Sequence, residues 1–152
     1  MNKIINYTLI LLFFILLSCD YKPILNYKNL QFSIQVEKTS GDEKINSIIA
    51  DKLNNIKGDE KEYFVSISSK KEKNIISKDS KGDPSIYEVI INVDYSVQRD
   101  EKILIKKNIS RKTTYNNITD KFELESYEKS IIDNLSSNIT ERIIFSISEI
   151  NE

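Results

Sequence analysis

The residue with the most distinctive chemistry in this 152-residue chain is Cys19, its only cysteine. It follows the nine-residue apolar run Leu9–Leu17 and the small residue Ser18. A short basic segment followed by an apolar stretch and a small residue is typical of a cleaved export signal. The sequence Leu16-Leu17-Ser18-Cys19 therefore predicts a lipoprotein signal peptide over residues 1–18, with Cys19 as the new N-terminus that receives acyl chains such as palmitate.

Two other interpretations of this stretch remain open, an ordinary secretory signal and an uncleaved membrane anchor. An ordinary cleavage site requires small residues at both the −3 and −1 positions, and Leu16 is not small. The run from Ile4 to Leu17 would be about 21 Å long as a helix, whereas a hydrocarbon core is about 30 Å thick. Residues 19–29 are expected to form a lipidated tether that lies as a strap on the domain or on a partner, with a flexible linker as the alternative.

Composition limits the chemistry that the remaining chain can perform. Without residues 1–18, 134 residues with 21 basic and 23 acidic side chains remain, a net charge of −2 that gives no footprint for nucleic acid. The chain has no histidine, which excludes Ser-His and Cys-His catalytic pairs and histidine-based metal sites. We therefore expect neither an enzyme nor a bound cofactor or metal, and a core that folds without disulfides.

Alternation of apolar and polar residues predicts strands over residues 30–37, 62–68, 86–98 and 102–115. The lysine-rich stretch 70–84 lacks a clear alternation and is expected to be a long polar loop. The charged run 99–102 is expected to be a hairpin turn. A two-residue turn would set apolar residues opposite polar ones, so we predict an odd-length loop with the pairs Val97–Ile103, Tyr95–Ile105 and Ile91–Ile109.

Two helices are predicted from apolar residues at helical spacing. The first should begin with Ser40 and Glu43 as a capping box and end at Gly58. The second should run from about Asp120 to Ile147 behind Thr119 as its N-cap.

Two residues depart from the apolar stripe of this second helix. Arg142 projects into the stripe and is expected to extend from the core edge to water, while Ile144 is expected to be exposed. A partner-facing helix end is the functional alternative for both.

The predicted order β-α-β-β-β-α gives one α+β domain over residues 30–152. It would consist of a four-stranded, mostly antiparallel sheet with two helices on one face. The other face would be open to solvent or to a partner, with apolar residues among polar ones: Phe64, Ile86, Ile90 and Leu104.

With this element order behind it, the segment Cys19 to Leu25 resembles the LPS-assembly lipoprotein family (LptE-type). Members of that family often carry Cys-Gly-aromatic-basic-Pro-Leu here, and this chain has Cys19-Asp20-Tyr21-Lys22-Pro23-Ile24-Leu25. The long central hairpin and a stretch containing Phe122 that leads into a final amphipathic helix also match. Asp20 departs from the family's usual glycine, and aspartate after the lipidated cysteine disfavours export to the outer membrane in some bacteria.

The resemblance implies a lipid-anchored protein on the periplasmic face of the outer membrane. Such a protein plugs a large β-barrel translocon (LptD-type), assists its assembly and helps to insert lipopolysaccharide at the cell surface. The alternative is a periplasmic lipid-binding lipoprotein of an ABC-type lipid transport system, which would need an apolar cavity between sheet and helices. Basic residues are the candidates for lipopolysaccharide contacts, with solvated surface charges as the alternative: Arg99, Lys102, Lys106, Lys107, Arg111 and Lys112.

Replacement of the single cysteine tests the anchor. Cys19→Ser removes the only thiol that can carry a thioether-linked lipid. We expect the variant to lose incorporation of labelled fatty acid completely and to leave the membrane fraction. Membrane retention of both proteins without any lipid on the unmodified chain would contradict the prediction.

Overall fold

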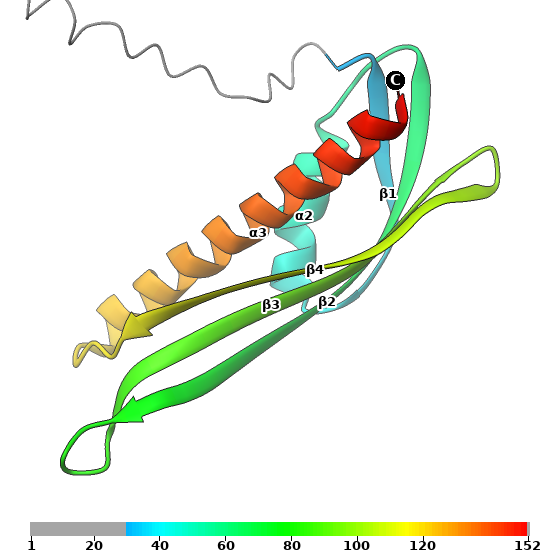
Figure 1. Ribbon diagram of the computed structural model, residues 1–152. Coiled ribbons are helices and arrows are strands. Elements are labelled where there is room, and N and C mark those ends of the chain that lie inside the picture. Colours follow the sequence, from blue (N-terminus) through cyan, green and yellow to red (C-terminus); the bar gives the residue numbers. More distant parts are fainter. Residues whose placement is uncertain (1–29, 152) are drawn as a thin grey trace, which may run out of the picture.

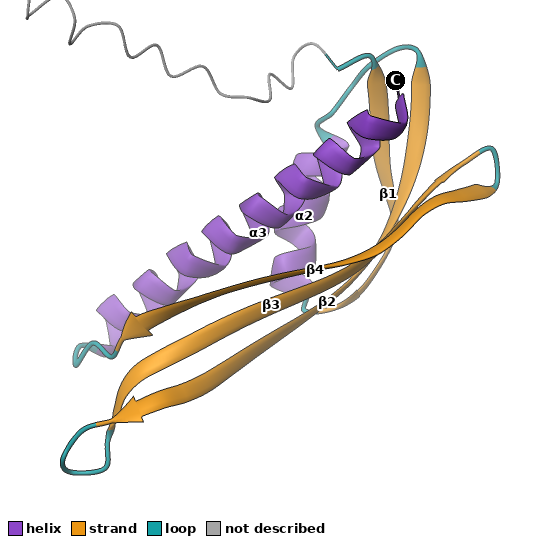
Figure 2. Ribbon diagram, in the orientation of Figure 1, coloured by secondary structure: helices purple, strands orange, loops and turns teal. Residues whose placement is uncertain are grey.

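A computed structural model describes residues 30–151, which form a sheet covered on one face by two helices (Figures 1 and 2). The predicted signal peptide, the lipid site Cys19 and the strap 19–29 lie outside the described residues. The predicted α+β fold and its order β-α-β-β-β-α are confirmed. The elements are β1 (Phe32–Gly41), α2 (Glu43–Asn54), β2 (Lys61–Lys78), β3 (Pro84–Arg99), β4 (Lys102–Asn116) and α3 (Lys121–Asn151).

The strands lie in the order β1-β2-β3-β4. β1 and β2 are parallel and are joined through α2, whereas β2–β3 and β3–β4 are antiparallel neighbours. In each strand, the apolar residues of the alternating pattern point to the inner face of the sheet, where their side chains are buried against α2 and α3. Isoleucine and valine dominate this core, as expected for a half-buried sheet.

The start of α2 differs from the prediction, because β1 continues through Ser40 and Gly41. Asp42 is the N-cap, and its Oδ1 accepts a hydrogen bond from the Ile45 N–H at 3.1 Å. Gly41 has a φ of 91°, and a Cβ there would lie 1.8 Å from the Ser69 carbonyl oxygen. Glycine is therefore required where the chain turns from β1 into the helix.

The end of α2 also differs from the prediction. The helix ends at Asn54, with Asn55 as its C-cap, so Gly58 lies beyond it. A Cβ on Gly58 would lie 2.4 Å from the backbone of Gln31 and Phe32. Gly58 thus permits the close approach of the loop after α2 to the start of β1.

The expected polar loop at residues 70–84 is wrong, because β2 extends to Lys78. Beyond Ser69 this strand has lost its β1 neighbour but remains paired with β3. Lys71 and Lys73 occupy inward-facing positions there, so the sequence shows no apolar alternation. The strand is held by its ladder to β3 and by polar contacts to the helices.

The part of the β2–β3 hairpin beyond Ser69, which we call the distal hairpin, contacts α3 through a cluster of Lys73, Glu128 and two tyrosines. Lys73 Nζ lies 2.5 Å from Glu128 Oε1 and 4.1 Å from the centroid of the Tyr87 ring. The Tyr115 hydroxyl donates to the same carboxylate oxygen at 2.6 Å, and its ring stacks on Tyr87. Burial, followed by the hydrogen bond and the charge of Glu128, raises the pKa of Tyr115. This cluster joins the distal hairpin to the first turns of α3.

The β3–β4 turn corrects the predicted odd loop. It is a two-residue turn at Asp100 and Glu101, with φ values of 51° and 62°. The register shifts between Gln98 and Val97, and Leu104 is the extra residue of a bulge. The bulge changes the register after the turn, so the three predicted pairs are wrong and the observed pairs are Gln98–Ile103, Val97–Ile105, Tyr95–Lys107, Val93–Ile109 and Ile91–Arg111.

α3 follows the predicted span closely but has a wider buried arc. Asp120, rather than Thr119, caps it by accepting a hydrogen bond from the Glu123 N–H at 2.9 Å. Ile144 is only 2% exposed, so its expected exposure is wrong, and Arg142 is exposed rather than part of the stripe. The arc widens because the second half of α3 packs on both the sheet and α2.

The cluster around Glu128 is expected to stabilise the folded domain in a pH-dependent way. Burial tends to raise the pKa of Glu128, but the hydrogen bonds from Lys73 and Tyr115 and the charges of Lys73 and Lys71 outweigh it, and the pKa is lowered. Glu128→Gln should reduce the free energy of unfolding by about 1–2 kcal/mol at pH 7, as measured by urea denaturation. A carboxylate whose pKa is lowered on folding stabilises the folded state at pH values above its unfolded pKa, near 4.5. This stabilisation is lost as the pH falls through the folded pKa.

The difference between the variant and the unmodified chain should therefore shrink as the pH falls below about 4.5 and vanish below the folded pKa of Glu128. Glu125→Gln, which neutralises an exposed carboxylate on the same helix, is the control and should have little effect. An equal loss of stability at pH 3 and pH 7 would contradict an ionic origin.

Candidate functional site

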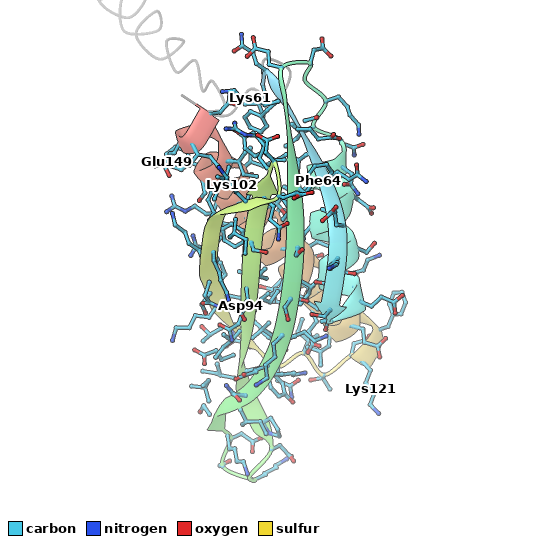
Figure 3. All side chains as sticks on the ribbon, turned by 90° about the vertical axis from the view of Figure 1, so that its right-hand side faces the viewer. Lys61, Phe64, Asp94, Lys102, Lys121 and Glu149 are labelled. Atoms are coloured by element: carbon cyan, nitrogen blue, oxygen red, sulfur yellow. The ribbon has the colours of Figure 1, made fainter. Side chains whose placement is uncertain are left out.

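The face of the sheet opposite the helices is a candidate binding surface; we call it the open face. Figure 3 shows it toward the viewer, with Phe64 and Asp94 among its residues. Phe64 and Ile90 alternate with buried neighbours and are half-buried, as is Ile86, while Leu104 is 41% exposed at the bulge. The predicted mixture of apolar and polar residues on this face is therefore present.

A shallow groove of about 760 Å³ crosses the middle of the open face, and we call it the serine groove. One row of paired residues across the four strands consists of Lys38, Ser66, Ser96 and Lys106. At about 4.8 Å per strand, the two lysines begin on strands roughly 14 Å apart. The groove thus presents hydroxyl groups between two cationic ends.

The adjacent row of the serine groove consists of Ser40, Ser68, Asp94 and Asn108. The Asn108 side-chain amide donates to Asp94 Oδ1 at 3.0 Å, which partly satisfies that carboxylate. Hydroxyl, amide and carboxylate groups can bind the hydroxyls of a sugar, and lysines can bind phosphate or carboxylate groups. The geometry is suited to binding a polar, anionic ligand.

The first three basic residues of the predicted site occupy different positions. Arg99 contacts the protein itself: its guanidinium donates to the Tyr63 hydroxyl at 3.2 Å, and its Nε lies 3.5 Å from Asp100 Oδ2. Lys102 is exposed at the hairpin turn. Only Lys106 lies in the middle row of the serine groove.

The other three predicted residues lie further along β4. Lys107 borders the serine groove beside Lys106, but it is paired with the buried Tyr95 and therefore begins on the helix side of the sheet. Arg111 is also on that side, where its Nε donates to the Asn138 side chain of α3 at 2.6 Å. Lys112 is on the open face but lies 3.2 Å from Glu88 Oε1. The six residues thus do not form one cluster.

Sequence reasoning missed the residues that complete the groove, namely Lys38 and the serines. The strand alternation does predict that Ser66, Ser68 and Ser96 face outward, because each lies next to an apolar residue that faces the core. A row across a sheet, however, depends on the register of all four strands. No single segment of the sequence contains it.

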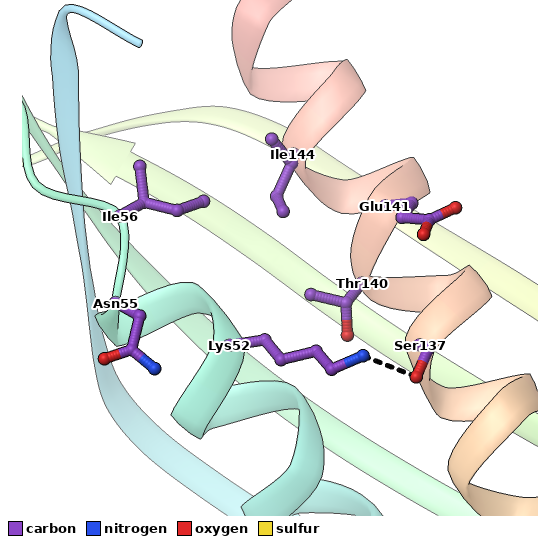
Figure 4. Close-up of a pocket in the computed structure, with 7 residues that line it drawn as sticks. All are labelled: Lys52, Asn55, Ile56, Ser137, Thr140, Glu141 and Ile144. Carbon is purple, nitrogen blue, oxygen red and sulfur yellow. Dashed lines mark hydrogen bonds between the residues drawn. The ribbon is translucent and has the colours of Figure 1, made fainter. Parts of the chain in front are cut away.

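A second, smaller cavity of about 270 Å³ lies between the two helices (Figure 4). Ile56 and Ile144 provide apolar walls, and Lys52 Nζ donates to Ser137 Oγ at 2.5 Å across it. It is smaller than the usual range for small-molecule sites, roughly 300–1,000 Å³. It also lies between helices, not between the helices and the sheet.

No group of three or more cysteine, aspartate or glutamate side chains within residues 30–151 could hold a metal ion. None of the helices described is both long and apolar enough to cross a membrane.

Comparisons with known proteins match the fold rather than the sequence. No protein-family model matches the chain, and no curated protein matches its sequence. Rare lipoprotein B from Shewanella oneidensis superposes with a TM-score of 0.57 at 18% identity, over 77% of this chain and 96% of that structure. Uncharacterized lipoprotein B from Nitrosomonas europaea gives 0.55 at 14% identity, over 78% and 86%.

A putative lipoprotein from Caulobacter crescentus CB15 gives a TM-score of 0.54 at 11% identity, over 76% of this chain and 88% of that structure. The matches cover most of each solved domain, so the similarity concerns the whole arrangement of sheet and helices. The chain therefore has the fold of these three lipoproteins.

Proposed function

We propose that this protein is a lipid-anchored subunit of a lipopolysaccharide-export complex of the LptE type, acting by binding rather than by catalysis. The observation that carries the proposal is the combination of a lipoprotein-type Cys19 with a domain that has the fold of three solved lipoproteins. Fold similarity at this level of identity does not assign function. The specific role rests on the Cys19–Leu25 resemblance and on the open face.

The anchor keeps the domain close to a membrane. Ten residues lie between Cys19 and Leu30, which makes eleven steps along the chain, and an extended chain covers at most about 3.6 Å per residue. The first described residue would then lie within roughly 40 Å of the lipid. We place the anchor in the outer membrane with the domain in the periplasm, and Asp20 makes the inner membrane the alternative to be tested.

The partner would be a β-barrel of the lipopolysaccharide-export type (LptD-type), with this domain as its plug and assembly factor. The open face supports this proposal because it combines half-buried Phe64 and Ile90 with serine, asparagine and charged side chains. Protein interfaces that are not permanent cores have such a mixed composition. The largely polar wall of a barrel lumen is a suitable counterpart.

The serine groove would be the site that meets lipopolysaccharide. Its hydroxyls and the terminal lysines Lys38 and Lys106 complement phosphorylated sugars. The alternative role, a lipid-binding component of an ABC-type system, needs an apolar cavity beneath the sheet. The space between sheet and helices is instead occupied by buried side chains such as Ile91 and Val93 of β3 and Ile139 of α3, so we favour the first role.

The partner can be tested in native membranes. A photo-crosslinker at Phe64 on the open face should join the protein to a barrel of the lipopolysaccharide-export class, identified by mass spectrometry. A crosslinker at Ser126, an exposed residue of α3, is the matched control for labelling of the opposite layer. Recovery of only ABC-transporter components at Phe64 would replace the proposed role with the alternative.

The serine groove can be tested by reversing its terminal charges. Lys38→Glu with Lys106→Glu should weaken lipopolysaccharide binding about tenfold or more, because two cationic contacts become repulsive. Lys121→Glu with Lys129→Glu makes the same change in net charge on exposed positions of α3 and should bind like the unmodified chain. Equal affinities of the two double variants, measured on immobilised lipopolysaccharide, would remove the groove from the proposal.

A further inference from the structure

The two edge strands of the sheet, β1 and β4, differ in how far other parts of the domain cover their outward backbone groups. The outer edge of β1 is closed by the end of α2 and the chain that follows it. The Ile34 N–H donates to the Ile56 carbonyl at 3.3 Å, and the Val36 N–H donates to Asn54 Oδ1 at 2.8 Å. This edge therefore offers fewer free backbone groups to another strand.

β4 forms the opposite edge (Figure 1), and its register shows which backbone groups point outward. The Asn117 N–H donates to the Ser85 carbonyl at 2.8 Å, so the Ser85–Asn117 pair belongs to the hydrogen-bonded set. Hydrogen-bonded and non-bonded pairs alternate along an antiparallel ladder. Between the bulge and Tyr115, the residues that direct their N–H and C=O groups away from β3 are Lys106, Asn108, Ser110, Lys112 and Thr114.

This outward row is accessible. All five residues are exposed. Within residues 30–151, no backbone hydrogen bond from another element reaches them. The row is about 27–30 Å long, enough for a nine-residue strand. It is the kind of edge to which an extended peptide adds by main-chain hydrogen bonds.

Charge identifies the type of strand that would add. β4 contains five basic residues and no acidic residue. Lys112 pairs with Glu88, but Lys106 and Lys107 form no salt bridge within the described range. A second copy of β4 would bring lysines beside lysines, which disfavours self-pairing. An acidic strand would gain the opposite interaction.

The chain's own N-terminal segment is a poorer candidate by the same criterion. Residues 20–29 contain Asp20, Lys22 and Lys28, a net positive charge. Pro23 also removes one backbone donor from the segment. Neither property complements a basic edge.

We propose that the outward row of β4, Lys106 to Thr114, is a strand-addition site for an extended acidic segment of a partner protein. The segment adds a fifth strand through main-chain hydrogen bonds, and its acidic side chains lie beside Lys106 and Lys112. This inference does not depend on the proposed role in lipopolysaccharide export, since it concerns backbone groups at the edge rather than the serine groove.

The test uses the full mature lipoprotein in detergent micelles and a capped nine-residue peptide of alternating glutamate and valine. Titration should shift the amide resonances of residues 106–114 and slow hydrogen exchange at the outward amides. Ser110→Pro deletes one outward N–H while leaving the N–H groups of the β3 ladder in place. It should weaken peptide binding about tenfold, whereas Ser110→Ala, which keeps the N–H, should bind like the unmodified chain.

A second variant keeps the test decisive if Ser110→Pro fails to fold. Lys106→Gln with Lys112→Gln keeps every backbone group and should weaken the glutamate peptide but not an uncharged threonine-valine peptide. Four results would overturn the proposal: equal binding of a lysine-valine peptide, unchanged binding to folded Ser110→Pro, concentration-dependent pairing of the protein through β4, or protection of the edge that vanishes on deletion of residues 20–29. The lipopolysaccharide assay on the Lys38 and Lys106 variant is read separately, so failure of either idea leaves the other testable.

Discussion

Burial of one aliphatic sheet face under two helices is the constraint on which the structure depends. The chain has a single cysteine, so no internal disulfide can hold this layer in place. Val65, Ile91 and Val93 on the strands are fully buried, as are Ile49 and Ile139 on the helices. Because α2 and α3 both cover the same side, the opposite side of the sheet and one of its edges are left for other molecules.

The core could be predicted where one face of a segment is purely apolar. β3 alternates over its whole length and was located almost to the residue. The distal half of β2 was missed because Lys71 and Lys73 occupy its inner positions, where Glu128, Tyr87 and Asp42 satisfy their charges. Ile144 was misjudged because a helix that contacts both a sheet and another helix needs a wider apolar arc than one surface requires.

The candidate site was harder to predict than the fold. The basic residues of β4 stand out in the sequence, but strand alternation directs Lys106 and Lys107 to different sides of the sheet. The one-residue bulge at Leu104 determines which of these two lysines faces the helices, and the local sequence does not predict the bulge. Lys38 lies 68 positions before Lys106 in the sequence, and the two share a row only because of the registers of the three strand pairs.

The turn between β3 and β4 bears on the order in which the chain assembles. Asp100 and Glu101 both hold positive φ, a conformation that asparagine and glycine adopt at lower cost. Such a turn is strained, so its local preference alone gives the hairpin little stability. Its strands are instead brought together by the buried faces they share with α3, whose residues come last in the sequence. The pairing of these strands thereby depends on the helix that follows them in the sequence.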